Sequence, residues 1–247
     1  MKTIPNVALG LALLLGGGCL AGTDEPSVAE TENALIAGNK LAANKLAANS
    51  LETQNLMSTA DGRELMSFIV GCALPTGQSV TALDQYGAAY TFDGWLNLAP
   101  AWATRAPTVS ERRWVTACLL ARTNVFGVPV SISMRHDTFI PLTSSAAERT
   151  AFPNAEGAFY GDLFAATPVI YACSNRSWTT YQAGTFRACA LATGSTTDCT
   201  FKYTGSCSAT PCMDKIAPFG SCSGDNTMYA EVVTIYLTPT QQQGATQ

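Results

Sequence analysis

The chain has 247 residues, of which 47% are apolar and 13% are charged, and its formal net charge is −4. This length and apolar content suit one domain with a real buried core. Lysine is almost absent after Lys45, where only Lys202 and Lys215 follow. Binding to nucleic acid needs clustered positive charge, so we expect no nucleic-acid partner.

The N-terminus carries an export signal. Lys2 precedes an apolar run over residues 7–15, three glycines and then Cys19. An apolar run this short cannot span a bilayer, which takes about 20 helical residues. The stretch resembles a bacterial lipoprotein signal, which implies that Cys19 is lipidated and anchors the chain to a membrane, here the outer membrane. The alternative is simple secretion as a soluble protein after cleavage near Ala21.

Residues 20–57 contain a repeat of five residues. Its apolar positions are Ile36, Leu41, Leu46, Leu51 and Leu56. A period of five fits neither a helix nor a strand, and so few units cannot bury a stacked face. We therefore expect a tether rather than an independent β-helix.

Eight further cysteines follow Cys19. They are Cys72, Cys118, Cys173, Cys189, Cys199, Cys207, Cys212 and Cys222. An even number in an exported chain predicts disulfides. There is no C-x-x-C pair and His136 is the only histidine, so we expect no metal site, and no motif indicates a cofactor.

Two amphipathic helices each place one cysteine on an apolar stripe. Asp61 is expected to begin the first helix, whose stripe runs through Leu65, Phe68, Ile69 and Cys72. Ser110 is expected to cap the second helix, from Glu111 toward Asn124, with Trp114 and Cys118 on its stripe. Because both stripes must be buried, the pattern predicts a Cys72–Cys118 disulfide.

The remaining elements are mostly strands. Residues 79–92 predict a hairpin, and residues 128–135 predict a strand with Ser131 and Ser133 facing outward. Ser145 is expected to cap a short helix. Further strands are expected at 158–164, 168–173 and 228–238, the last apolar on both faces and so central. Helices and strands without a βαβ rhythm indicate an α+β fold.

This pattern divides the chain into five parts. They are a signal peptide (1–18), an anchor and tether (19–57), an α+β core (58–172), a cysteine-rich lobe with the final core strand (173–240) and a disordered tail (241–247). The body, with "IVGCALP", "GWLNLAPAW", "WVTACLLAR", "SISMR" and "EGAFYGDLF" beside the Asn/Leu repeat, resembles secreted lipoproteins of myxobacteria over residues 33–237. That resemblance implies an exported lipoprotein and carries over no catalytic residues.

Three patterns could carry chemistry. "GSCSG" around Cys222 has the form of a nucleophile elbow, but lacks the flanking strand and helix. His136 and Asp137 follow a strand and could serve a hydrolase, or simply cap a loop. Carboxylates near strands, namely Glu156, Asp162 and Glu231, could form a catalytic pair.

The loop between Cys173 and Cys189 is the candidate binding segment. Its aromatic and basic residues are Arg176, Trp178, Tyr181, Phe186 and Arg187. Exposed aromatic residues beside arginine are typical of binding sites, although these could instead pack on the domain. We therefore expect a cell-envelope binding module for an unknown protein or glycan ligand and lean against an enzyme. The alternative is a secreted hydrolase that uses His136 or a carboxylate pair.

Overall fold

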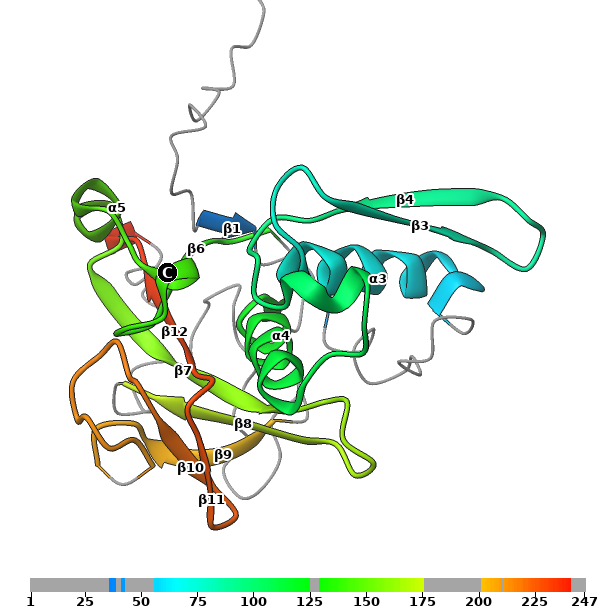
Figure 1. The fold of residues 1–247 in the computed structure, drawn as a ribbon. Helices are drawn as coiled ribbons and strands as arrows, with labels where there is room; N and C mark the ends of the chain where they lie inside the picture. Colours follow the sequence, from blue (N-terminus) through cyan, green and yellow to red (C-terminus); the bar gives the residue numbers. More distant parts are fainter. Residues whose placement is uncertain are drawn as a thin grey trace, which may run out of the picture. The chain divides into compact units, whose positions relative to one another are not determined.

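A computed structural model describes residues 36–38, 41–42, 56–124, 129–175, 201–209 and 211–240 (Figure 1). These residues all belong to one compact unit, Glu32–Gln247. Cys19, Cys189, Cys199 and the candidate binding loop lie outside the described residues, and so does Val128 of the predicted strand.

Short helices and strands alternate irregularly along the described chain. In order they are β1 (Ile36–Gly38), β2 (Leu41–Ala42), α3 (Ala60–Ala73), β3 (Ser79–Leu83), β4 (Ala89–Asp93), η1 (Pro100–Ala103), α4 (Val109–Ala121), β5 (Thr123–Asn124), β6 (Ser131–Arg135), η2 (Ile140–Leu142), α5 (Ala146–Ala151), β7 (Asn154–Asp162), β8 (Val169–Ser174), β9 (Lys202–Ser206), β10 (Cys222–Gly224), β11 (Thr227–Tyr229) and β12 (Val233–Leu237).

The main sheet has six described strands in the order β1-β6-β12-β7-β8-β9. Neighbouring strands are antiparallel except β8 and β9, which are parallel. The predicted α+β class is confirmed, and so is the central position of the last strand, since β12 pairs with both β6 and β7. The first two units of the five-residue repeat supply β1 and β2, which pair with β6 and β5.

The alternation of side chains along the strands builds two separate cores. In β7, Phe159 packs into the core that contains α3 and α4, whereas its neighbours Ala158 and Tyr160 pack into a second core. In β8, Ala172 likewise faces the first core and Cys173 faces the second. Because successive strand residues point to opposite faces, the sheet is buried on both sides. Helix α4 packs on β7 and β12 over one face (Figure 1).

Helix α3 begins at a threonine rather than at the predicted Asp61. The Thr59 hydroxyl accepts a hydrogen bond from the Gly62 amide, and Asp61 lies in the first turn, where its charge favours the helix N-terminus. The Thr59 hydroxyl, two residues before Asp61, is the better cap because its oxygen reaches the free backbone amides of the first turn. The apolar stripe is buried as predicted.

Helix α4 likewise starts at Thr108, not at the predicted Ser110. Thr108 and Glu111 form a reciprocal capping box. Arg105 donates two hydrogen bonds to the Glu111 carboxylate, at 2.7 and 2.8 Å. These bonds lower the pKa of Glu111 to about 2. The helix start therefore keeps its charged cap throughout the neutral and mildly acidic range.

The Cys72–Cys118 disulfide joins α3 to α4, as the two stripes predict. The Cα atoms are 6.1 Å apart and both cysteines are fully buried. The Arg122 guanidinium lies beside this bridge, stacked over the Phe68 ring at 4.3 Å and the Trp95 ring at 5.5 Å. Burial lowers the pKa of Arg122 to about 10.

Strands β3 and β4 form the predicted hairpin, which lies along α3 (Figure 1). Asp84 holds its turn by accepting the amides of Tyr86 and Ala88. Gly87 has φ +82°, the left-handed region that glycine adopts without strain. One face of the hairpin packs on the helix and the other is exposed.

Two strand predictions need correction. Ser133 was expected to face outward, but it is fully buried because α5 covers that side of β6 and bonds to it. The expected continuous strand over 228–238 is two strands, β11 and β12, separated by Ala230–Val232. Its first half turns away to pair with β10 in the cysteine-rich region.

The cysteine-rich region is held by its own bridges. Cys173 pairs with Cys207, and Cys212 pairs with Cys222. Such bridges are typical of extracytoplasmic domains. Among the described residues, the structure contains no helix with the length and apolarity needed to cross a membrane.

Candidate functional site

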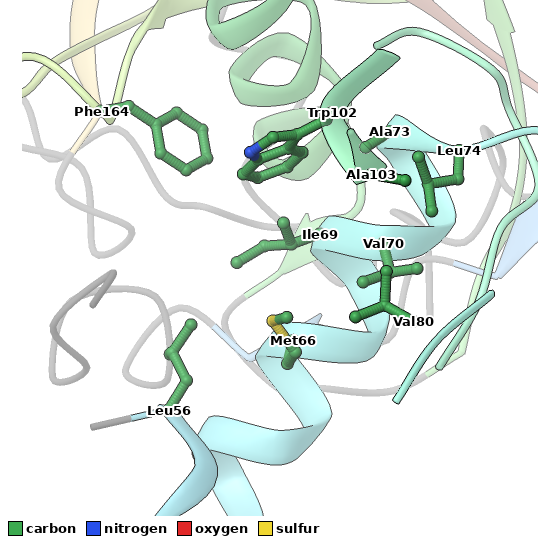
Figure 2. Close-up of a pocket in the computed structure, with 10 residues that line it drawn as sticks. All are labelled: Leu56, Met66, Ile69, Val70, Ala73, Leu74, Val80, Trp102, Ala103 and Phe164. Carbon is green, nitrogen blue, oxygen red and sulfur yellow. The ribbon is translucent and has the colours of Figure 1, made fainter. Parts of the chain in front are cut away.

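An apolar pocket lies between α3, the hairpin and two loops (Figure 2). Its volume is about 180 Å³. The residues that line it are Leu56, Met66, Ile69, Val70, Ala73, Leu74, Val80, Trp102, Ala103 and Phe164. Within this lining, the indole N–H of Trp102 is the one polar side-chain group.

Helix α3 supplies the floor of the pocket because it is apolar on two adjoining faces. Cys72 of the predicted stripe bonds to α4, while Met66, Val70 and Ala73 lie on the pocket side together with Ile69, which belongs to both faces. Val80 of β3 closes one side from the hairpin (Figure 2).

Two aromatic side chains form the opposite wall. Trp102 comes from η1, and Phe164 comes from the turn after β7, so they are brought together only by the fold. Their rings meet edge to face with centroids 5.6 Å apart (Figure 2). This arrangement is the favourable one for two aromatic quadrupoles and gives a firm apolar wall.

The pocket offers no catalytic groups. Its described lining carries no carboxylate, imidazole, hydroxyl or thiol. Pockets that orient and react a substrate need convergent polar groups. The geometry therefore suits retention of an apolar group by burial.

The predicted His136–Asp137 pair lies elsewhere, just after β6. The backbone amides of Thr138 and Phe139 point at Nδ1 of His136, and Nε2 lies 3.2 Å from the Gly220 carbonyl oxygen. Asp137 Oδ1 is 2.9 Å from Nδ1. The Nε2 atom, which a general base would aim at a nucleophile, faces a backbone carbonyl instead. His136 thus ties the end of β6 to the cysteine-rich region.

Ser133, on the strand before His136, belongs to a buried polar network. Its hydroxyl donates to the Glu148 carboxylate at 2.7 Å and accepts from Arg135 Nε at 2.7 Å. Arg135 also donates to the carbonyls of Glu148 and Phe152 at the end of α5, and lies 3.9 Å from the centre of the Tyr236 ring. This network fastens α5 to the sheet.

Glu156 and Asp162 do not form the pair that glycoside hydrolysis needs. Glu156 and Asp162 are six residues apart on β7, which at about 3.3 Å per residue places them roughly 20 Å apart. Catalytic pairs lie about 5–9.5 Å apart.

Two of the predicted carboxylates are instead partners of neighbouring arginines on α4. Arg112 Nη2 is 3.1 Å from Asp162, and Arg113 Nη1 is 3.8 Å from Glu231. Asp162 also accepts the Phe164 amide, which holds the turn that presents Phe164 to the pocket. The carboxylate of Asp162 therefore supports the pocket wall without lining it.

The remaining predictions fall outside the pocket. Cys222 is disulfide-bonded to Cys212 and fully buried, so the nucleophile-elbow interpretation is wrong. The aromatic and basic residues of the candidate binding loop, 176–187, lie outside the described residues, and their role stays a prediction.

No pattern in the sequence predicted the pocket. Its signal was present in "MSFIVGCAL", an α3 segment too apolar for a helix with one buried face, and in Trp102 within a loop. Neither feature indicates which distant residue completes the wall.

Together, fold and site define a disulfide-bridged α+β domain of the extracytoplasmic type with an apolar pocket. Comparison with protein-family models, with curated proteins and with solved structures gave no match.

Proposed function

We propose that this protein is a membrane-anchored cell-envelope domain that binds a small hydrocarbon group in the pocket on α3. The observation that carries the proposal is the pocket's lining, which is apolar at all ten positions. Burial of apolar surface is the main driving force for binding in such a site. The cell-envelope location rests on the disulfides and on the export signal.

The size of the pocket sets the size of the ligand. An apolar protein cavity of about 150 Å³ stays dry and accepts benzene. A pocket of about 180 Å³ therefore holds a group of roughly six to eight carbon atoms. A straight alkyl chain, such as the end of an acyl chain, suits it because Met66 is a flexible side chain that can adjust to a linear group.

Calorimetric titration with n-alkanols of increasing length tests the pocket. Each added CH₂ is expected to tighten binding about fourfold, because burial of one CH₂ contributes about 0.8 kcal/mol. The gain should stop at about six to eight carbons, when the pocket is full. Affinity that rises without a break up to decanol would contradict a pocket of this volume, and benzyl alcohol binding tighter than hexanol would favour an aromatic ligand.

Adjacent residues of β3 supply a matched pair of variants. Val80→Trp fills the pocket and should weaken hexanol binding by roughly tenfold or more, the effect of losing about two buried CH₂ groups. Thr81→Trp places the same side chain on the exposed face of the hairpin, beside Thr91, and should leave the affinity unchanged. Equal affinities for hexanol in the two variants would show that hexanol does not bind in this pocket.

Membrane attachment through Cys19 is tested by Cys19→Ser. The variant should move from the membrane fraction to the soluble fraction of the exporting cell, because the acyl chains supply the anchor. Mass measurement of the mature N-terminus gives the control, since wild type should begin at an acylated Cys19. A wild-type protein that is already soluble, with a cut near Ala21, would establish simple secretion instead.

A further inference from the structure

The apolar pocket has a buried half and an open half. Five of its ten lining residues are at most 4% exposed, namely Leu56, Ile69, Val70, Ala73 and Leu74. The other five are half-buried or exposed, namely Met66, Val80, Trp102, Ala103 and Phe164. A ligand therefore enters past the open half and buries its far end against the buried half.

Trp102, in the open half, carries the one polar side-chain group among the ten lining residues. Among the described residues, none accepts a hydrogen bond from its indole N–H. Figure 2 shows the indole nitrogen on the edge of the ring that points toward Phe164, the other aromatic residue of this half. The edge-to-face contact of the two rings, with centroids 5.6 Å apart, holds the indole in this orientation. The open half thus presents one hydrogen-bond donor to a ligand.

The charged side chains nearest in sequence to the two aromatic residues already have partners. Arg105, three residues after Trp102, donates two hydrogen bonds to the Glu111 carboxylate at 2.7 and 2.8 Å. Asp162, two residues before Phe164, forms an ion pair of 3.1 Å with an arginine of α4. Neither side chain offers an unpaired charge to a ligand in the open half. An ionised ligand would lose water there without gaining a counter-charge, which is unfavourable.

We propose that the ligand of this pocket is a neutral acyl group of about six to eight carbon atoms, as in a fatty acyl ester, whose carbonyl oxygen accepts the Trp102 indole N–H. This inference rests on the proposed function and adds the polar end of the ligand to it. The alkyl chain extends from the carbonyl toward Ile69 and Val70 on α3. An ester suits the site because it has no N–H or O–H donor, and the lining side chains contain no oxygen atom to accept one.

The hydrogen bond is tested by the binding of methyl hexanoate and n-hexane to wild type and to Trp102→Phe, measured by headspace partitioning of these volatile ligands. Both ligands have a six-carbon chain, but only the ester has a carbonyl. The smaller ring of phenylalanine reduces apolar contact with both ligands, whereas loss of the donor affects the ester alone. Trp102→Phe should therefore weaken ester binding by roughly two- to tenfold more than n-hexane binding, the usual effect of one hydrogen bond. Equal losses for the two ligands would overturn the assignment.

The indole N–H signals supply an independent measurement on the wild-type protein. The chain has four tryptophans, so a ¹⁵N–¹H spectrum contains four indole signals, and the one that Trp102→Phe lacks belongs to Trp102. Methyl hexanoate should move this signal downfield, because the N–H proton is deshielded when it bonds to a carbonyl, whereas n-hexane should not. The other three signals serve as the control. A Trp102 signal that moves equally with both ligands would refute the hydrogen bond.

Hexanoate tests the neutrality of the ligand. At pH 7 its carboxyl group is ionised, so it presents the same acyl chain as methyl hexanoate with a negative charge. It should bind wild type at least about tenfold more weakly than the ester, because the open half supplies no counter-charge. Hexanoate that binds as tightly as the ester would show that the site takes a fatty acid instead.

Failure of the acyl assignment and failure of the proposed function give different results. If 1-hexanol, n-hexane and methyl hexanoate all fail to bind, the pocket holds no hydrocarbon group and both are wrong. If n-hexane binds, and Trp102→Phe changes its affinity and that of the ester by the same factor, the hydrocarbon pocket stands and the acyl assignment alone is wrong.

Discussion

Removal of the Cys72–Cys118 bridge by Cys72→Ala/Cys118→Ala is expected to lower the free energy of unfolding by about 4 kcal/mol. The bridge spans 46 residues, and closing a loop of that length in the unfolded chain removes this much conformational entropy at 25 °C. Urea unfolding of the oxidised variant and wild type, followed by circular dichroism, measures the difference.

The Cys212–Cys222 bridge is the matched control for this effect. Its cysteines are as deeply buried as Cys72 and Cys118, but it spans only 10 residues. Cys212→Ala/Cys222→Ala should therefore cost about 2.7 kcal/mol by the same relation. A cost below about 1 kcal/mol for the longer bridge would show that the contact between α3 and α4 does not depend on the disulfide.

Arg135→Met is expected to cost about 3–5 kcal/mol of stability, because it leaves the buried Glu148 carboxylate without the attraction of the Arg135 guanidinium. Both residues are 5% exposed. The substitution also removes the donors to the Glu148 and Phe152 carbonyls at the end of α5. Calorimetric or urea unfolding gives the value.

A second variant distinguishes lost packing from an unpaired charge. Arg135→Met/Glu148→Leu removes both charges and should regain a large part of the loss, since apolar side chains can replace two interacting buried charges at little cost. If the double variant is as unstable as the sum of the two single ones, the carboxylate is not the source of the penalty.

The helices were predictable because the residues that specify each of them lie close together in the sequence. Apolar residues at i, i+3, i+4 and i+7 specified the buried side of α3, and the positions of Cys72 and Cys118 on two such stripes specified the bridge. The caps were misplaced by two residues because several hydroxyl and carboxylate residues compete at each helix start, and only backbone geometry selects Thr59 and Thr108.

The pocket and the contact between Cys173 and Cys212 were not predictable because their parts are distant in sequence. Trp102 meets Phe164 only because of the position of the turn after β7. Cys173 meets Cys212 only because the region before β10 folds back over the sheet. Ser133 was placed on the wrong side for a similar reason, because α5 covers a face that local alternation assigns to solvent.

The central strand of the sheet is made late in synthesis. Strand β12, at Val233–Leu237, is the only described strand that bonds to both β6 and β7. Until it leaves the ribosome, these two strands have no shared neighbour, and each presents an unpaired edge. The sheet therefore cannot close while the C-terminal end of the chain is still being made. The same arrangement leaves a chain cut short before Val233 with two open edges, which makes it prone to aggregate.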